Sequence, residues 1–166
     1  MEAARFEVGP SRCVAHQGDF GGKAEVTLNV FFDSSALAKR YVEEKGSDQV
    51  QAILSSASAL AVSVICVPEI VSALCRLRRE RKLSTEEYRN AKASVLTDID
   101  AATVIGITEE VIAHGVALLE QFSLRSADAL HIACAAEWAT DLFVSADDRQ
   151  CKAARPRGLR VEGIEV

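Results

Sequence analysis

Three acidic residues stand shortly after apolar runs that have the length and composition of buried strands. They are Asp33 after 28–32, Glu69 after 59–65, and Asp147 after 142–145. If these runs are neighbouring parallel strands, the three carboxylates meet at the edge of the sheet where strands end and helices begin. Two carboxylates about 4 Å apart repel by roughly 4 kcal/mol at an effective dielectric constant near 20, so such a cluster calls for a cation.

Oxygen-only ligands favour Mg²⁺, with Mn²⁺ as a substitute. A divalent ion held by carboxylates can turn a bound water into a nucleophile and can stabilise charge that develops on a phosphate. Each acid taken singly has a simpler interpretation, because the helix dipole favours Asp and Glu in a first helical turn. Asp128 also lies in such a turn, but two predicted helices separate the third strand from the fourth, so spacing alone does not bring Asp128 to this edge.

The elements that would position these acids alternate along the chain. We expect strands at 28–32, 59–65, 103–107 and 142–145, with a last edge strand at 159–161. Helices are expected at 34–43, 47–55, 68–82, 84–99, 108–121, 126–139 and 147–154. Short strands that alternate with helices predict an α/β fold with a mostly parallel sheet of four to five strands and helices on both faces.

The length of 166 residues, with 49% hydrophobic and 26% charged residues, predicts one globular domain. Residues 1–25 carry four of the nine glycines and no apolar periodicity, so they are either a flexible extension or the product of a misassigned start codon, with Val26 as the true initiator. The folded domain is therefore expected to span 26–166.

The chain has no apolar run long enough to cross a membrane and no secretory signal, so we expect a cytoplasmic protein. Its five cysteines form no Cys-x-x-Cys pair, and we expect reduced thiols rather than a disulfide framework. The net charge of −5 excludes binding of nucleic acid by overall charge alone. An RNA substrate would have to be held by a local patch or through metal ions.

Four segments of the chain resemble the PIN-domain family, and within it the VapC-type toxins. They are FDSSALAKRY at 32–41, PEIVSAL at 68–74, LRSADALHIA at 124–133 and VSAD at 144–147. The resemblance implies an α/β/α sandwich and a Mg²⁺-dependent endoribonuclease that acts as the toxin of a toxin–antitoxin pair. It also implies an antitoxin protein as partner and a homodimer.

The resemblance also assigns roles to individual residues. Asp33, Glu69 and Asp128 match the first three catalytic, metal-binding acids of the family, and Asp147 matches the fourth, although the adjacent Asp148 is an alternative. Three further residues are expected to orient carboxylates or waters, or to bind the RNA phosphate: Ser35, Ser145 and Arg125.

Other functions remain open at this point. One is a non-catalytic PIN domain that binds RNA or protein. Another is a phosphatase with Asp33 as nucleophile, although Ser35 stands where such enzymes place a second aspartate. His131 and Cys134 are three residues apart on one predicted helix, but no second pair completes a zinc site, so we expect both side chains to pack in the core.

A chain that starts at Val26 is predicted to fold as well as the full chain, because residues 1–25 offer no apolar face to the core. The melting temperatures of the two chains, measured by circular dichroism, should agree within about 3 °C, a change of roughly 1 kcal/mol for a protein of this size. A larger loss on truncation would show that the first 25 residues pack on the domain.

Overall fold

The computed structural model describes residues 28–166, and the expectations for residues 1–25 lie outside this range. Its five strands are β1 (Asn29–Phe32), β2 (Ala59–Ser63), β3 (Thr103–Ile105), β4 (Leu142–Ser145) and β5 (Val161–Gly163). They form one sheet in the order β3-β2-β1-β4-β5, and every pairing is parallel. The predicted α/β class and the five-stranded parallel sheet are confirmed.

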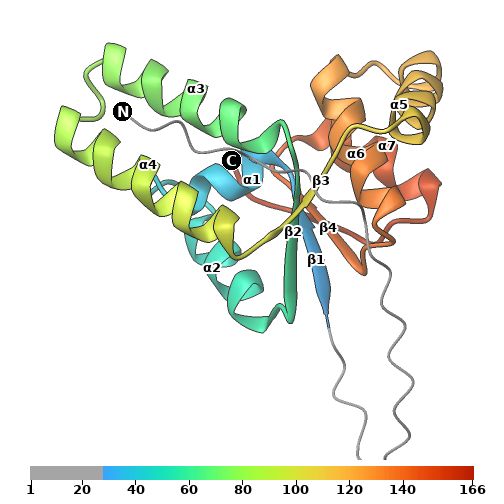
Figure 1. Cartoon of the computed structure of the whole chain (residues 1–166), viewed down its shortest axis with the longest axis horizontal. Helices are drawn as coiled ribbons and strands as arrows, with labels where there is room; N and C mark the ends of the chain where they lie inside the picture. Colours follow the sequence, from blue (N-terminus) through green and yellow to red (C-terminus); the bar gives the residue numbers. More distant parts are fainter. Residues whose placement is uncertain (1–27) are drawn as a thin grey trace, which may run out of the picture.

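The helices cover both faces of this sheet, so the molecule is an α/β/α sandwich (Figure 1). The helices are α1 (Ser34–Leu37), α2 (Ser47–Ser56), α3 (Cys66–Arg79), α4 (Thr85–Asp100), α5 (Glu109–Gln121), α6 (Ser126–Glu137) and α7 (Asp148–Ala154), with short 3₁₀ helices η1 (Ala38–Arg40) and η2 (Arg155–Arg157). Val30 and Phe32 of β1 pack with α1 to α4, whereas Phe31 packs with α5 to α7. Successive side chains of a strand point to opposite faces, which produces these two apolar layers.

The chain order places a switch point at the central strand. β1 pairs with β2 on one side and with β4 on the other, so the chain builds the sheet outward to β3 and then returns across β1. Past the end of β1, the Asp33 amide donates a hydrogen bond to the Val144 carbonyl of β4 (3.0 Å). Ligand-binding groups of open α/β sheets collect at such a point, outside the carboxyl ends of the strands.

The predicted helix 34–43 differs most from the structure. It is divided into the four-residue α1 and the short η1, and it ends at Arg40. The Lys39 carbonyl oxygen, which would pair with residue 43 in a longer helix, instead accepts a hydrogen bond from the Ser47 hydroxyl (2.7 Å). The last strand also starts two residues later than predicted, at Val161, where it pairs with Phe143. Its position is fixed by pairing with β4 rather than by its own short pattern.

Among residues 28–166, no helix is long and apolar enough to cross a membrane. The four cysteines of this range are free thiols, of which Cys66, Cys134 and Cys151 are buried and Cys75 is half-buried. The expectation of unpaired cysteines is confirmed for the described part of the chain.

Candidate active site

Asp33 is a fully buried carboxylate at the carboxyl end of β1. It forms the N-terminal cap of α1, where one of its oxygens accepts a hydrogen bond from the Ala36 amide (2.9 Å). The Ser35 hydroxyl contacts both carboxylate oxygens (2.9 and 2.7 Å), and the Ser145 hydroxyl donates to Oδ2 (3.1 Å). Burial raises the pKa of Asp33, although attraction by His131 and these hydrogen bonds oppose the shift.

The two serines therefore orient the carboxylate of Asp33. Each also binds the chain beyond β4: Ser35 Oγ accepts from the Ala146 amide (3.1 Å), and Ser145 Oγ accepts from the Asp147 amide (3.0 Å). The two hydroxyls fix the first acid relative to the segment that carries Asp147.

Asp128, the third residue of α6, lies in the same cleft as Asp33. Its Oδ2 accepts a hydrogen bond from the Arg125 amide at the start of the helix (3.1 Å). Its Oδ1 lies 3.3 Å from Nε2 of Gln150, and the same nitrogen donates to Oδ2 of Asp33 (2.8 Å). Sequence reasoning did not single out Gln150, because a lone glutamine carries no motif.

Glu69, in the first turn of α3, is held by two neighbours. Its Oε2 lies 2.6 Å from Nε2 of His131 and 2.7 Å from the Ser34 hydroxyl, which donates to it. Burial acts to raise the pKa of Glu69, but the hydrogen bonds from His131 and Ser34 together outweigh it, and the pKa lies below its ordinary value.

His131 is buried, but it does more than pack. The short contact with Glu69 places the imidazole against a candidate metal ligand, whereas the sequence had predicted only a core position. The spacing of three residues between Asp128 and His131 puts both on one side of α6 and was the signal that could have indicated this contact.

Asp147 caps the N-terminus of α7 and points to its own helix. One of its oxygens accepts from the Arg149 amide (2.7 Å), and the other pairs with the Arg149 guanidinium (2.7 Å). The hydrogen bond from the Arg149 side chain is the main cause of the lowered pKa of Asp147. The alternative fourth acid, Asp148, is exposed and does not line the cleft.

The four acids line one cleft of about 580 Å³. Basic side chains line it as well: Lys39, Lys45, Arg76 and Arg125. Within residues 28–166, no three acidic, histidine or cysteine side chains converge closely enough to enclose a metal ion as they stand. The donor set nevertheless has the chemistry of an Mg²⁺ site, because it offers carboxylate oxygens, and a neutral amide rather than a cation lies between Asp33 and Asp128.

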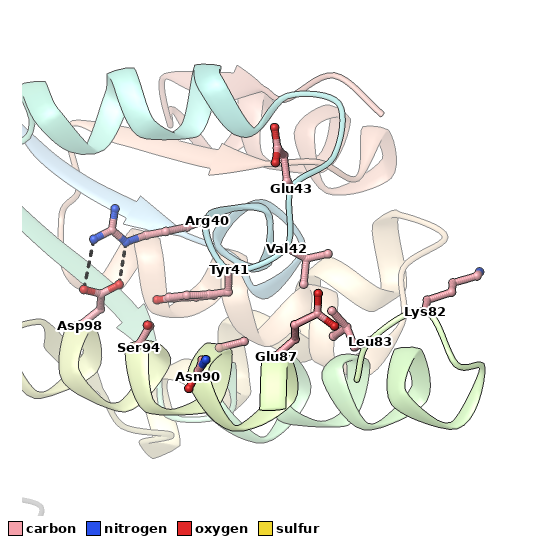
Figure 2. Close-up of a pocket in the computed structure, with 11 residues that line it drawn as sticks. Arg40, Tyr41, Val42, Glu43, Lys82, Leu83, Glu87, Asn90, Ser94 and Asp98 are labelled. Carbon is pink, nitrogen blue, oxygen red and sulfur yellow. Dashed lines mark hydrogen bonds and ion pairs between the residues drawn. The ribbon is translucent and has the colours of Figure 1, made fainter. Parts of the chain in front are cut away.

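A larger hollow of about 740 Å³ lies between η1 and α4 (Figure 2). There Arg40 forms two hydrogen bonds with Asp98 (2.6 and 3.2 Å) and a third with Gln51 (2.7 Å). None of the predicted site residues lines this hollow, and its one carboxylate–guanidinium pair is already satisfied. We therefore assign the chemistry to the smaller, acidic cleft.

Comparisons with known proteins agree with this fold. The family model for the PIN domain matches residues 30–156. Ribonuclease VapC45 and Ribonuclease VapC49 of Mycobacterium tuberculosis are each 32% identical over 140 residues, which cover 82% of this chain and 96% of each relative. The chain belongs to the PIN-domain family.

Within that family, the chain belongs with the VapC ribonucleases. Similar solved structures include a toxin–antitoxin complex from Klebsiella pneumoniae (TM-score 0.62, 16% identity, 82% of this chain and 99% of that one). VapBC2 from Rickettsia felis, bound to a DNA fragment from its promoter, has a TM-score of 0.60 at 12% identity and covers 83% of this chain and 100% of that one. At these identities, the solved structures confirm the fold.

Asp33→Asn is predicted to stabilise the metal-free protein at neutral pH. Because the pKa of Asp33 is raised in the folded chain, ionisation of Asp33 costs folding free energy as the pH rises above about 4, the ordinary value for aspartate. Asparagine does not ionise. In EDTA at pH 7, the variant should melt at least about 2 °C above the wild type, where 1 kcal/mol corresponds to about 2–4 °C.

The difference in melting temperature should grow between pH 4 and pH 7. The matched control is Asp148→Asn, which removes an exposed carboxylate from the same end of the sheet. At pH 7 its melting temperature should stay closer to that of the wild type than that of Asp33→Asn does. A difference for Asp33→Asn that shrinks as pH rises would contradict the raised pKa.

Proposed function

We propose that this protein is a metal-dependent endoribonuclease that acts as the toxin of a toxin–antitoxin pair. The observation that carries the proposal is the cleft that Asp33, Glu69, Asp128 and Asp147 line together with basic side chains. The VapC relatives are named ribonucleases, and the solved neighbours include toxin–antitoxin complexes, which supports the same function.

The proposed cofactor is Mg²⁺, with Mn²⁺ as a substitute, and the proposed ligands are the four acids. When bound, such an ion supplies an activated water and stabilises negative charge on the phosphate. Glu69 and Asp147 would exchange part of their contacts with His131 and Arg149 for contacts with the ion. Ser35 and Ser145 hold the orientation of Asp33 throughout, since both bind its carboxylate from within the protein.

The RNA phosphate would be bound by basic side chains on the wall of the cleft. Arg125 is exposed, and only its backbone amide is used to bind Asp128, so its guanidinium is available to a phosphate oxygen. Arg76 and Lys45 line the same cleft. Because the net charge is −5, RNA binding requires a local basic patch or metal ions, and these side chains would supply the patch.

A phosphatase with Asp33 as nucleophile fits the geometry poorly. A nucleophilic carboxylate must reach the phosphorus of its substrate, but Asp33 is fully buried and its Oδ2 accepts from Ser35, Ser145 and Gln150. These hydrogen bonds fix the carboxylate in one orientation. A fixed carboxylate suits a metal ligand better than a nucleophile.

We propose two protein partners, an antitoxin and a second copy of this chain, acting with the RNA in the cytoplasm. The homodimer is supported by an apolar stripe on α5, where Ile112 and Val116 are 51% and 49% exposed and Leu119 is 39% exposed. Burying such side chains against a second copy stabilises association.

Purified protein is predicted to cleave single-stranded RNA with Mg²⁺ or Mn²⁺, and EDTA should abolish the cleavage. Asp33→Asn, Glu69→Gln and Asp128→Asn should each lower the rate by more than about 100-fold. Loss of a residue that only orients a metal ligand costs up to about 100-fold, and loss of a ligand should cost more. Asp147→Asn should lower it less, and the control Asp148→Asn should leave it within about two-fold. Equal cleavage by all variants would mean that the acids are structural or that a contaminant cleaves.

The α5 stripe is predicted to form the homodimer contact. The full chain should have the mass of a dimer by light scattering at micromolar concentration, and Val116→Asp should convert it to a monomer because the change buries a charge at the contact. Leu96→Asp, which changes an equally exposed apolar residue on α4, is the matched control and should remain dimeric. A monomeric wild type would exclude the dimer.

A further inference from the structure

Gln150 is a long polar side chain that is 3% exposed and lies between two candidate metal ligands. Its Nε2 is 2.8 Å from Oδ2 of Asp33 and 3.3 Å from Oδ1 of Asp128. A side-chain amide nitrogen carries two hydrogens, so it can donate one to each carboxylate. Gln150 therefore ties the acid that follows β1 to the acid that α6 contributes.

The orientation of the amide is determined by these two acids. Its Oε1 is buried and has no hydrogen-bond partner among the described residues. An unpaired buried acceptor is unfavourable. The reverse orientation would place Oε1 against two carboxylate oxygens, where like partial charges repel. The unpaired oxygen is thus tolerated because the nitrogen is required on the other side.

A neutral donor has a particular consequence at this position. A lysine or arginine between Asp33 and Asp128 would cancel the negative potential that attracts a divalent cation. The amide holds the two carboxylates within reach of one atom and leaves their charge in place. Residues that orient metal ligands in this way commonly change metal affinity by about 10–100-fold.

We propose that Gln150 is a positioning residue that sets the separation of Asp33 and Asp128 for a divalent cation. The inference rests on the proposed metal-dependent function, because it assigns a role toward the ion. It acts through the two acids and requires no contact between Gln150 and the RNA.

The test compares Gln150→Met with Gln49→Met by calorimetric titration of the metal-free proteins with Mn²⁺. Methionine has a similar length but donates no hydrogen bond. Gln49, on α2, also donates to a carboxylate, Oε1 of Glu162 at 2.9 Å, and does not line the cleft, so it is a matched control. Gln150→Met should bind Mn²⁺ at least about ten-fold more weakly than the wild type, and Gln49→Met within about two-fold.

Unchanged Mn²⁺ affinity in a folded Gln150→Met protein would overturn the proposal, even if its melting temperature fell. A second measurement uses the wild type and does not depend on a variant that folds. In ¹⁵N-labelled protein, the side-chain amide resonances of Gln150 should shift as Mg²⁺ is added to saturation, whereas those of Gln49 should not. Gln150 resonances that stay in place would also overturn the inference.

Neither measurement uses RNA, so the two proposals can fail separately. A protein that cleaves no RNA but needs Gln150 for Mn²⁺ affinity would contradict the proposed function and support this inference. Metal-dependent cleavage by a protein whose Mn²⁺ affinity does not depend on Gln150 would support the proposed function and contradict this inference.

Discussion

The carboxylate of Asp33 is completely buried at the end of the central strand, and a buried charge is tolerated only when hydrogen bonds or opposite charges surround it. Much of the surrounding structure supplies those hydrogen bonds. The Ala36 amide comes from the first turn of α1, the Ser145 hydroxyl from the end of β4, and the Gln150 amide from α7. These elements adjoin the central strand at the switch point of the sheet. The strand order therefore brings together the hydrogen-bond donors that the buried Asp33 carboxylate requires.

The acids of the cleft have different hydrogen-bond partners, and their pKa values are shifted in opposite directions. Burial raises the pKa of Asp33. The pKa of Glu69 is lowered because His131 and Ser34 together outweigh its burial, and the pKa of Asp147 is lowered mainly by the hydrogen bond from the Arg149 side chain. Glu69 and Asp147 are therefore ionised over a wider pH range and have partners that an arriving cation would replace. Among residues 28–166, Asp33 has no positively charged hydrogen-bond partner, so the charge of a cation offers it the most stabilisation.

The surface of the protein separates into regions with different chemistry. Acidic and basic side chains line the same cleft, although the chain as a whole is negative. The helix α5 covers the opposite face of the sheet from α3 (Figure 1). The exposed apolar side chains Ile112, Val116 and Leu119 belong to α5. A contact made through α5 would therefore use a different helix layer from the one that contributes Glu69.

The sequence by itself determined the α/β class, the sites of most strands, and the positions of Asp33, Glu69 and Asp147 just beyond strand ends. These features follow from local apolar patterns and from the rule that parallel strands end at one edge. The position of Asp128 came only from the resemblance to a family, because two helices separate it from the third strand.

Only the tertiary structure decided how these acids are held. The contact of His131 with Glu69 joins residues 62 positions apart, and the contact of Gln150 with Asp33 joins residues 117 apart. The early end of the first helical segment also involves a later segment, since the Ser47 hydroxyl donates to the Lys39 carbonyl. No local pattern records such contacts, because they form only when the packing of the sheet and helices brings distant side chains within hydrogen-bonding distance.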